Sequence, residues 1–513
     1  MLTLSGRSES SLRSRLIMVV LAAMALLLAG MRPASAVPAV LYVDGGNPSC
    51  SDSGSGTASV PFCTIKKGAA VAVEGQTVQV ASGTYQELVT FGHSGSAGSP
   101  IVLTAAPGAN VTVTGMANGF KVSGRSWVTV KNFTVTGTTS YGIYVASSSS
   151  NVTVSGNTVT STGSHGIYLT SLSSQVTVSG NTVRGANGYG IYVNTLSDIT
   201  VSGNAVSDTT SYGIHVNGSS DVTVSGNNVS GAGERVSGST KYGIKLANTT
   251  ASLVSDNVSH DNSEAGVFLD ADTNGVEVTG NQTFGNARGY ARAAPGIDVR
   301  GFSNTVDRNV SHNNEDSGLQ FYTGSHDNLV VDNLTYGNGD HGIDDLGSTN
   351  QRIISNTVYD NVAAGINVEG SSTGATVMNN ISVDNGIDSP RTHSNIRVDA
   401  TSTTGTTVDY NLVFLSTPDT MYVWGKTSYS SLKAFQVTGQ EAHGVEDNPS
   451  WVAAGSNFHL RSDSPAIDSA NSGASGETST DLEGSGRVDD PATPNTGAGP
   501  RRYDDRGALE FQP

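Results

Sequence analysis

Acidic residues and a histidine gather in one short stretch of a chain that is otherwise poor in charge. Residues 338–347 read NGDHGIDDLG, whereas only 14% of the whole chain is charged. Carboxylates this dense are typical of two kinds of chemistry, which are binding of a hard cation and proton transfer between an acid and a base. The residues concerned are Asp340, His341, Asp344 and Asp345, with Asp316 lying 24 residues before Asp340.

A repeated phrase shows which elements position these residues. VTVSGNTV occurs at 152–159 and 176–183, and close variants follow at 199–206 and 222–229. Its Asn recurs every 23–31 residues from Asn132 to Asn411, and in most units a Gly-Ile phrase follows nine residues later. Apolar residues alternate at period two, which indicates short strands with one inward face. A unit of this length cannot bury that face alone, so copies must stack.

The repeat predicts an all-β chain folded as a right-handed parallel β-helix of about 11–13 coils. Helical repeats are excluded because no unit shows 3.6-residue spacing, and a propeller blade needs about 40 residues. The recurring Asn is expected to form an inward ladder at one turn. We divide the chain into a signal peptide (1–36), an N-terminal cap and first coils (37–105), the β-helix (106–415) and a capping, loop-rich tail (416–513). A short helix over 64–73 is expected to cover the first coil.

The N-terminus has the features of an export signal. Arginines precede an apolar run at 16–29, and Ala34-Ser35-Ala36 resembles a cleavage site. A membrane anchor is the alternative, but the run is shorter than the roughly 20 residues that span a bilayer. We therefore expect a secreted protein with no membrane contact after cleavage, and a disulfide between Cys50 and Cys63.

The charge balance limits the choice of partner. The full chain carries −17, and removal of 1–36 takes away four Arg and one Glu to leave −20. Nucleic acid is therefore an unexpected partner, because phosphate binding needs a basic surface. An acidic polysaccharide needs a bridging cation or a local Arg/Lys cluster. A monomer is expected.

Several phrases resemble the right-handed parallel β-helix proteins of the pectate-lyase-like superfamily. They are LYVDGG and VASGTYQE near the start, the coil repeats, and SPAID and DRGALE in the tail. The resemblance covers nearly the whole mature chain and implies the fold. It does not define the reaction, because that superfamily includes lyases, hydrolases, epimerases and non-catalytic surface proteins.

Departures from the repeat mark a candidate site. The outward residue two after each Gly of the Gly-Ile phrase is Tyr in three early coils and then becomes polar or charged. The residues four after that Gly change in the same way. The column members that we expect to bind substrate or act on it are Asp298, Gln320, Asp344, Asn367 and Arg397, with Arg300, Tyr322 and Glu369 beside them.

Three insertions fall at one corner of the coil, beside this column. They span about 230–242, 284–295 and 385–394 and carry Glu234, Arg235, Lys241, Arg288, Tyr290, Arg292, Asp388, Arg391 and His393. Loops at one edge of one face build the walls of a groove. Neutral variation of turn length is the alternative.

The acids are arranged as expected for a calcium site. Asp316 and Asp340 are one coil apart, and neighbouring parallel strands lie about 4.8 Å apart. Calcium takes 6–8 oxygen ligands, for which we predict Asp316, Asp340, Asp344 and Asp345. A solvated acidic corner without metal is the alternative. Asp345 falls on an inward position, so it either turns inward to meet the metal or marks a bulge.

At these residues the chain resembles the calcium-dependent pectate lyases of polysaccharide lyase family nine. That family holds its calcium with four aspartates, of which Asp316, Asp340 and Asp344 match three and His341 replaces the fourth. Its base is a lysine, but this chain has none between Lys245 and Lys426. The candidate catalytic residues are therefore Arg397, Arg391, Arg300 and His341, with His393 added to the substrate-binding set.

The sequence thus predicts a secreted lyase that cleaves an acidic polysaccharide such as pectate by calcium-assisted β-elimination. A uronate C5-epimerase remains open, because both reactions begin by removing the C5 proton. A β-helix glycoside hydrolase with paired carboxylates is a second alternative. A non-catalytic carbohydrate-binding or surface protein is the third.

Overall fold

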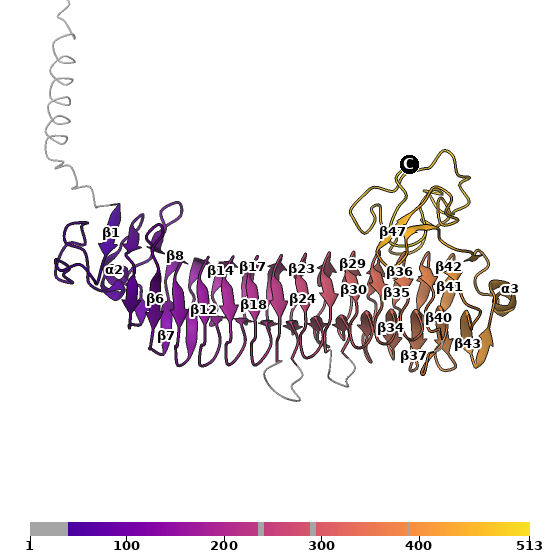
Figure 1. Ribbon diagram of the computed structural model, residues 1–513, viewed down its shortest axis with the longest axis horizontal. Coiled ribbons are helices and arrows are strands. Elements are labelled where there is room, and N and C mark those ends of the chain that lie inside the picture. Colours follow the sequence, from indigo (N-terminus) through magenta and orange to yellow (C-terminus); the bar gives the residue numbers. More distant parts are fainter. Residues whose placement is uncertain (1–38, 234–240, 288–293, 388) are drawn as a thin grey trace, which may run out of the picture.

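The computed structural model describes residues 39–233, 241–287, 294–387 and 389–513. The predicted signal peptide lies outside the described residues. The chain winds into one elongated solenoid with its strands stacked along the long axis (Figure 1). This confirms the predicted right-handed parallel β-helix, with about 14 coils. The number exceeds the range predicted from the Asn repeat because the first coils precede Asn132 and lack that marker.

Three sheets of 15 strands form the walls of the solenoid, and between the two ends of the stack each strand pairs with the third one after it. Sheet A runs from β1 (Val40–Val43) to β41 (Thr407–Asp409), and sheet B from β3 (Gly83–Tyr85) to β45 (Val445–Glu446). All pairs are parallel except the last pair of sheet C. The apolar residues of the repeats fill the interior as one continuous core.

Sheet C carries the Gly-Ile phrases and therefore the candidate site. Its strands are β4 (Val89–Thr90), β7 (Asn118–Ser123), β10 (Tyr141–Ala146), β13 (Ile167–Leu169), β16 (Ile191–Asn194), β19 (Ile214–Asn217), β22 (Ile244–Ala247), β25 (Val267–Leu269), β28 (Ile297–Val299), β31 (Leu319–Phe321), β34 (Ile343–Leu346), β37 (Ile366–Glu369), β40 (Ile396–Asp399), β43 (Tyr422–Gly425) and β44 (Thr427–Tyr429).

The repeated Asn forms the predicted ladder at the turn from sheet A to sheet B. Asn157 Nδ2 donates to Asn181 Oδ1 at 3.0 Å and to Val130 O at 3.1 Å. The same pattern continues from coil to coil as far as Asn411, whose amide groups donate to the buried carboxylate of Glu441. Since buried polar groups are usually hydrogen-bonded, this explains why the Asn recurs from coil to coil.

The helix α2 (Ile65–Val71) covers the first coils, as the sequence predicts. It packs against β1, β2 (Thr77–Val80) and β4. Thr64 caps it by accepting from the backbone N–H of Lys67 at 3.1 Å, a common way to satisfy a free helix end. The Cys50–Cys63 disulfide is present just before this helix.

The other end of the stack is closed by α3 (Leu432–Phe435) and the 3-10 helix η1 (Gln436–Thr438). The ring of Phe435 stacks on Tyr422 with centroids 4.1 Å apart. The chain then turns back and forms the hairpin of β46 (Trp451–Ala453) and β47 (Asn457–Leu460). The ring of Phe458 packs on Tyr336 and Tyr359 of sheet B, so the tail covers that sheet from outside.

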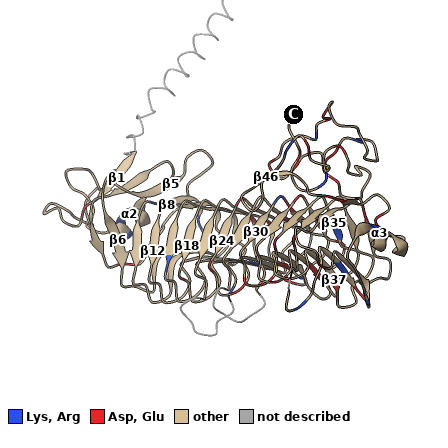
Figure 2. Ribbon diagram, turned by 45° about the vertical axis from the view of Figure 1, so that its right-hand side comes forward, with Lys and Arg blue, Asp and Glu red and all other residues tan. Residues whose placement is uncertain are grey.

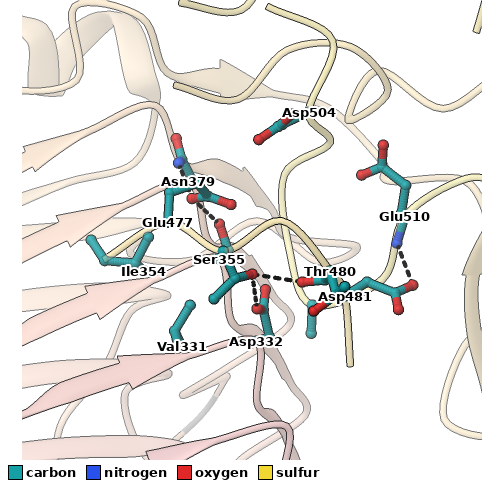
Figure 3. A network of polar contacts seen from close by, with 12 residues as sticks. Val331, Asp332, Ile354, Ser355, Asn379, Glu477, Thr480, Asp481, Asp504 and Glu510 are labelled. Atoms are coloured by element: carbon teal, nitrogen blue, oxygen red, sulfur yellow. Dashed lines mark hydrogen bonds between the residues drawn. The ribbon is translucent and has the colours of Figure 1, made fainter. Parts of the chain in front are cut away.

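A buried ionic network anchors the tail to the coils. Arg487 donates to Asp332 at 2.7 Å and to Glu510 at 3.0 Å, and all three side chains are almost completely buried. Figure 3 shows Ser355 and Asn379 pointing from the stack toward Glu477 of the tail, and both donate to its Oε2 at 2.7 Å. This network lies on turns between sheets A and B, away from sheet C.

Charged residues of both signs gather in the C-terminal half of the stack, around β37, and in the tail (Figure 2). Among the described residues, no helix is long and apolar enough to cross a membrane.

Candidate functional site

The predicted outward column is present in the strand register of sheet C. Phe268 pairs with Asp298, Asp298 with Gln320, and Gln320 with Asp344. The column continues through Asn367 to Arg397. Asp298, Gln320, Asp344 and Asn367 are all buried although they point out of the solenoid. The site is therefore a covered polar layer, which the sequence pattern did not indicate.

Asp344 stands at the centre of a chain of hydrogen bonds along this column. Its Oδ2 accepts from Gln320 Nε2 at 3.1 Å and its Oδ1 from Asn367 Nδ2 at 2.9 Å. Arg397 Nη1 donates to Asn367 Oδ1 at 2.7 Å and to Glu369 Oε2 at 2.6 Å. Burial raises the pKa of Asp344. Both carboxyl oxygens of Asp344 are thus occupied by protein donors.

Asp316 and Asp340 form a pair on adjacent coils. The backbone N–H of Asp340 donates to the carbonyl of Asp316 at 3.2 Å, so the two residues are neighbours on adjacent coils. Burial, and then the charge of Asp340, raise the pKa of Asp316 to about 8. Arg391 Nη1 donates to Asp340 Oδ2 at 2.6 Å. The pair therefore combines a protonated carboxyl with a carboxylate that is neutralised by a guanidinium.

His341 lies between this pair and Asp344. Its Nδ1 is 3.7 Å from Asp340 Oδ2 and 3.7 Å from Asp344 Oδ1, which is longer than a hydrogen bond. Its Nε2 is 2.8 Å from Thr392 Oγ1. The same hydroxyl accepts from the backbone N–H of Ala364 at 3.4 Å. The imidazole is thus buried and held by a loop residue.

The insertion at 385–394 supplies both loop contacts, through Arg391 and Thr392. It lies against the acidic pair as one wall of the site, as the sequence predicts for an insertion at this corner, and it also carries the partly buried His393. The site role of Thr392 was missed, because a threonine in a loop gives no chemical signal. The predicted wall residues Glu234, Arg235, Arg288, Tyr290, Arg292 and Asp388 lie outside the described residues.

Asp345 lies apart from this group on the inward side of its strand, which is one of the two positions that the sequence predicts, and its role as a metal ligand stays a prediction. It pairs with Phe321 on one side and Val368 on the other, both in the core. Strand alternation therefore points it inward, and the register shows no bulge. Its Oδ1 accepts from the hydroxyls of Ser348 and Ser372, and burial raises its pKa to about 7. Two serines that the sequence analysis did not consider thus bind one oxygen of this buried carboxyl group, whereas Oδ2 has no hydrogen-bond partner among the described residues.

A third group lies two coils toward the N-terminus. Arg300 Nε and Nη2 donate to Asp298 Oδ2 at 3.2 and 2.9 Å. The guanidinium carbon lies 5.0 Å from the ring centroid of Phe268 and 4.7 Å from that of Tyr322. Burial raises the pKa of Asp298. Arg300 is thus separated from the acidic pair.

The side chains present do not fit calcium as they are arranged. Both oxygens of Asp344 hold amide hydrogen bonds, Asp340 holds Arg391, and Asp345 faces the other way. Within the described ranges, no three His, Cys, Asp or Glu side chains are grouped as metal ligands. Calcium at Asp316 and its neighbours stays a prediction, and no step proposed below depends on the ion.

Comparison with known families identifies the architecture. The model of the right handed beta helix region matches residues 108–229 and 290–430, which is just over half of the chain. The chain belongs to the right-handed beta helix family. A model of the periplasmic copper-binding protein NosD matches residues 228–344.

Individual relatives add the fold alone. The uncharacterized protein YwoF of Bacillus subtilis is 32% identical over 123 residues, which cover 21% of this chain and 26% of YwoF. The structure of XylC in complex with xylose matches 92% of this chain and 98% of its own, with a TM-score of 0.51 and 13% identity. Pectate lyase Pel9A matches 92% and 96%, with a TM-score of 0.39 and 16% identity.

Proposed function

We propose that this right-handed β-helix protein is an exported enzyme that cleaves a uronate-containing polysaccharide by β-elimination. The observation that carries the proposal is the pair of Asp316 and Asp340 beneath Arg391. The disulfide in the N-terminal cap is consistent with an oxidising compartment outside the cytoplasm.

The pair has the properties of an acid and a base at neutral pH. A pKa of about 8 keeps Asp316 protonated near pH 7, whereas Asp340 carries an ion pair with Arg391. Two carboxyl groups in environments that separate their protonation states are the usual arrangement for general acid–base chemistry. Asp340 is the proposed base and Asp316 the proposed acid.

Arg391 connects the pair to the class of substrate. Its side chain is 56% exposed while Nη1 binds Asp340. A guanidinium can bind a carboxylate with two parallel hydrogen bonds. The C6 carboxylate of a uronate therefore competes with Asp340 for Arg391. That exchange neutralises the substrate carboxylate, which makes the C5 proton more acidic, and frees Asp340 to act as base.

The proposed elimination proceeds without an external reagent. Asp340 removes the C5 proton, the C5–H electron pair becomes the C4–C5 double bond, and the C4–O bond breaks. The leaving oxygen takes the proton of Asp316. After the reaction Asp340 is protonated and Asp316 is ionised, and proton exchange with water restores the starting protonation of both.

Arg391 favours elimination over hydrolysis at this pair, because a guanidinium that neutralises the substrate carboxylate makes the C5 proton more acidic. The resemblance to family nine at Asp316, Asp340 and Asp344 agrees with elimination and is part of this proposal.

Hydrolysis is the second candidate, and a different pair favours it. Asp298 and Asp344 lie two coils apart in one outward column, or about 10 Å from the strand spacing. Burial raises the pKa of both carboxyl groups. This is the wider separation that inverting glycosidases use.

The test is turnover of a panel of uronate polymers, followed by ultraviolet absorbance of the unsaturated product and by assay of new reducing ends. Elimination by the wild type, lost in Asp316→Asn and in Asp340→Asn but retained in Asp298→Asn, supports the proposal. Reducing ends without an unsaturated product, abolished by Asp298→Asn, would support hydrolysis instead.

A further inference from the structure

A row of cations and aromatic rings lies on sheet C, beyond the acidic pair. It consists of Lys245 on β22, Phe268 on β25, and Arg300 and Tyr322 directly after β28 and β31. We call these four residues the cation–aromatic strip. The Phe268 ring centroid is 5.0 Å from the ammonium of Lys245 and 5.0 Å from the guanidinium carbon of Arg300. The two cations therefore flank one ring.

Lys245 is a cation with no close counter-ion among the described residues. Its ammonium also lies 5.0 Å from the ring of Tyr212 and 5.5 Å from that of Tyr242. No carboxylate of the described residues lies within 4.0 Å of it, and Asp270 interacts with it only at longer range. Partial burial lowers the pKa of this lysine. A partly desolvated ammonium that lies among aromatic rings can bind an anion.

Arg300 is held in place and keeps donors to spare. Nε and Nη2 both donate to one oxygen of Asp298, whereas Nη1 has no partner among the described residues. The rings of Phe268 and Tyr322 hold the plane of the guanidinium, and 39% of its side chain is exposed. A positioned guanidinium of this kind binds carboxylates well, since little freedom is lost on binding.

The column changes character toward the N-terminus. There the rings of Tyr168 and Tyr192 stack on each other, with centroids 5.0 Å apart and an interplanar angle of 3°. Stacked rings cover each other's faces, so this pair of rings stabilises the fold and carries no charge. Two cations in contact with one ring occur at Lys245 and Arg300.

We propose that the cation–aromatic strip is a second binding site for carboxylates of the same uronate polymer, remote from the acidic pair. The inference rests on the proposed function. Charge complementarity supports it, because the chain as a whole carries −17 and repels a polyanion except at such local cations.

The register sets the geometry of the bound polymer. From the spacing of parallel strands, Lys245 lies about 14 Å along the axis from the coil of Asp316 and about 19 Å from that of Asp340, and Arg300 lies about 5 and 10 Å from them. A sugar unit in an extended polymer has roughly the length of one coil step. A dimer at the acidic pair cannot reach Lys245, whereas a hexamer that lies along sheet C can reach both cations.

Binding of purified oligogalacturonates and oligomannuronates of two and six units tests the inference by titration calorimetry. The titrations use the Asp316→Asn variant, in which turnover of the substrate is abolished. We expect Lys245→Met to weaken hexamer binding about tenfold, as for the loss of one charge-assisted contact, with no change for the dimer. Lys245→Arg should restore most of the affinity. The double variant Asp298→Asn with Arg300→Gln should also weaken hexamer binding about tenfold. Asp298 is replaced as well so that loss of Arg300 leaves no buried carboxylate unpaired.

Lys121→Met is the matched control. Lys121 also lies over a ring of the column, 5.8 Å from the centroid of Tyr144, but five strands before Lys245 and without a second cation. It should leave hexamer binding unchanged. Hexamer binding that Lys245→Met leaves intact overturns this inference and leaves the proposed function standing. Failure of every acidic hexamer to bind overturns both.

Discussion

Replacing Asp316 by asparagine should make the protein more stable and inactive at the same time. The folded chain keeps this carboxyl protonated to about pH 8, whereas the unfolded chain releases the proton near pH 4. Folding is therefore penalised increasingly as the pH rises between those values. At pH 7 the penalty is about 4 kcal/mol, from 1.36 kcal/mol for each pH unit. Asparagine does not titrate, and its amide can still donate to Asp340.

Urea unfolding of wild type and Asp316→Asn at pH 4, 7 and 9 measures this difference. We expect nearly equal stability at pH 4 and a gain for the variant that grows to several kcal/mol at pH 7 and above. Asp327→Asn is the control, because Asp327 is exposed and its pKa is lowered by His326 and Asn350. An Asp316→Asn variant that shows no gain at pH 7 would refute the buried, protonated carboxyl. One that keeps full activity would refute its role as acid.

Three further substitutions test other parts of the structure. Asn309→Ala removes one rung of the ladder and leaves its buried neighbours unpaired, so urea unfolding should show a loss of about 3–5 kcal/mol; a loss below 1 kcal/mol would contradict this. Arg487→Met leaves buried carboxylates without their cation and should cost about 3–5 kcal/mol, seen as faster proteolysis of the tail, whereas Arg184→Met at an exposed pair should have little effect; equal cleavage of the two variants would argue against the network. Arg391→Gln should lower kcat/KM on uronates about tenfold or more and leave the thermal melt unchanged, since the side chain is largely exposed; unchanged kinetics would remove Arg391 from the site.

The fold could be predicted from the sequence because the chain repeats itself. The spacing between Asn157, Asn181 and Asn204 equals the length of one coil, and the alternation of Val with polar residues indicates which side chains face inward. A repeat also defines a register, so the sequence alone predicts the outward column from Asp298 to Arg397. The coil length, the inward face and the register therefore follow from the period of the sequence, and no long-range contact has to be predicted.

The contacts within the site could not be predicted in the same way. Whether Asp344 meets calcium or two amides depends on side-chain orientations that a period does not encode. Arg391 reaches Asp340 from an insertion 51 residues later, and an insertion has no register. The repeat predicts an inward Asp345 but not its serine partners, because these serines look like ordinary turn residues.

The most direct test of the proposed reaction is to incubate the protein with polygalacturonate, alginate and related uronate polymers. The ultraviolet absorbance at about 235 nm is then followed with time. Elimination creates a C4–C5 double bond, so the account predicts a rising signal together with new reducing ends, and loss of both in Asp340→Asn. The measurement is made with and without chelator to test the calcium prediction separately. New reducing ends with no rise in absorbance, or no change with any uronate polymer, would contradict β-elimination.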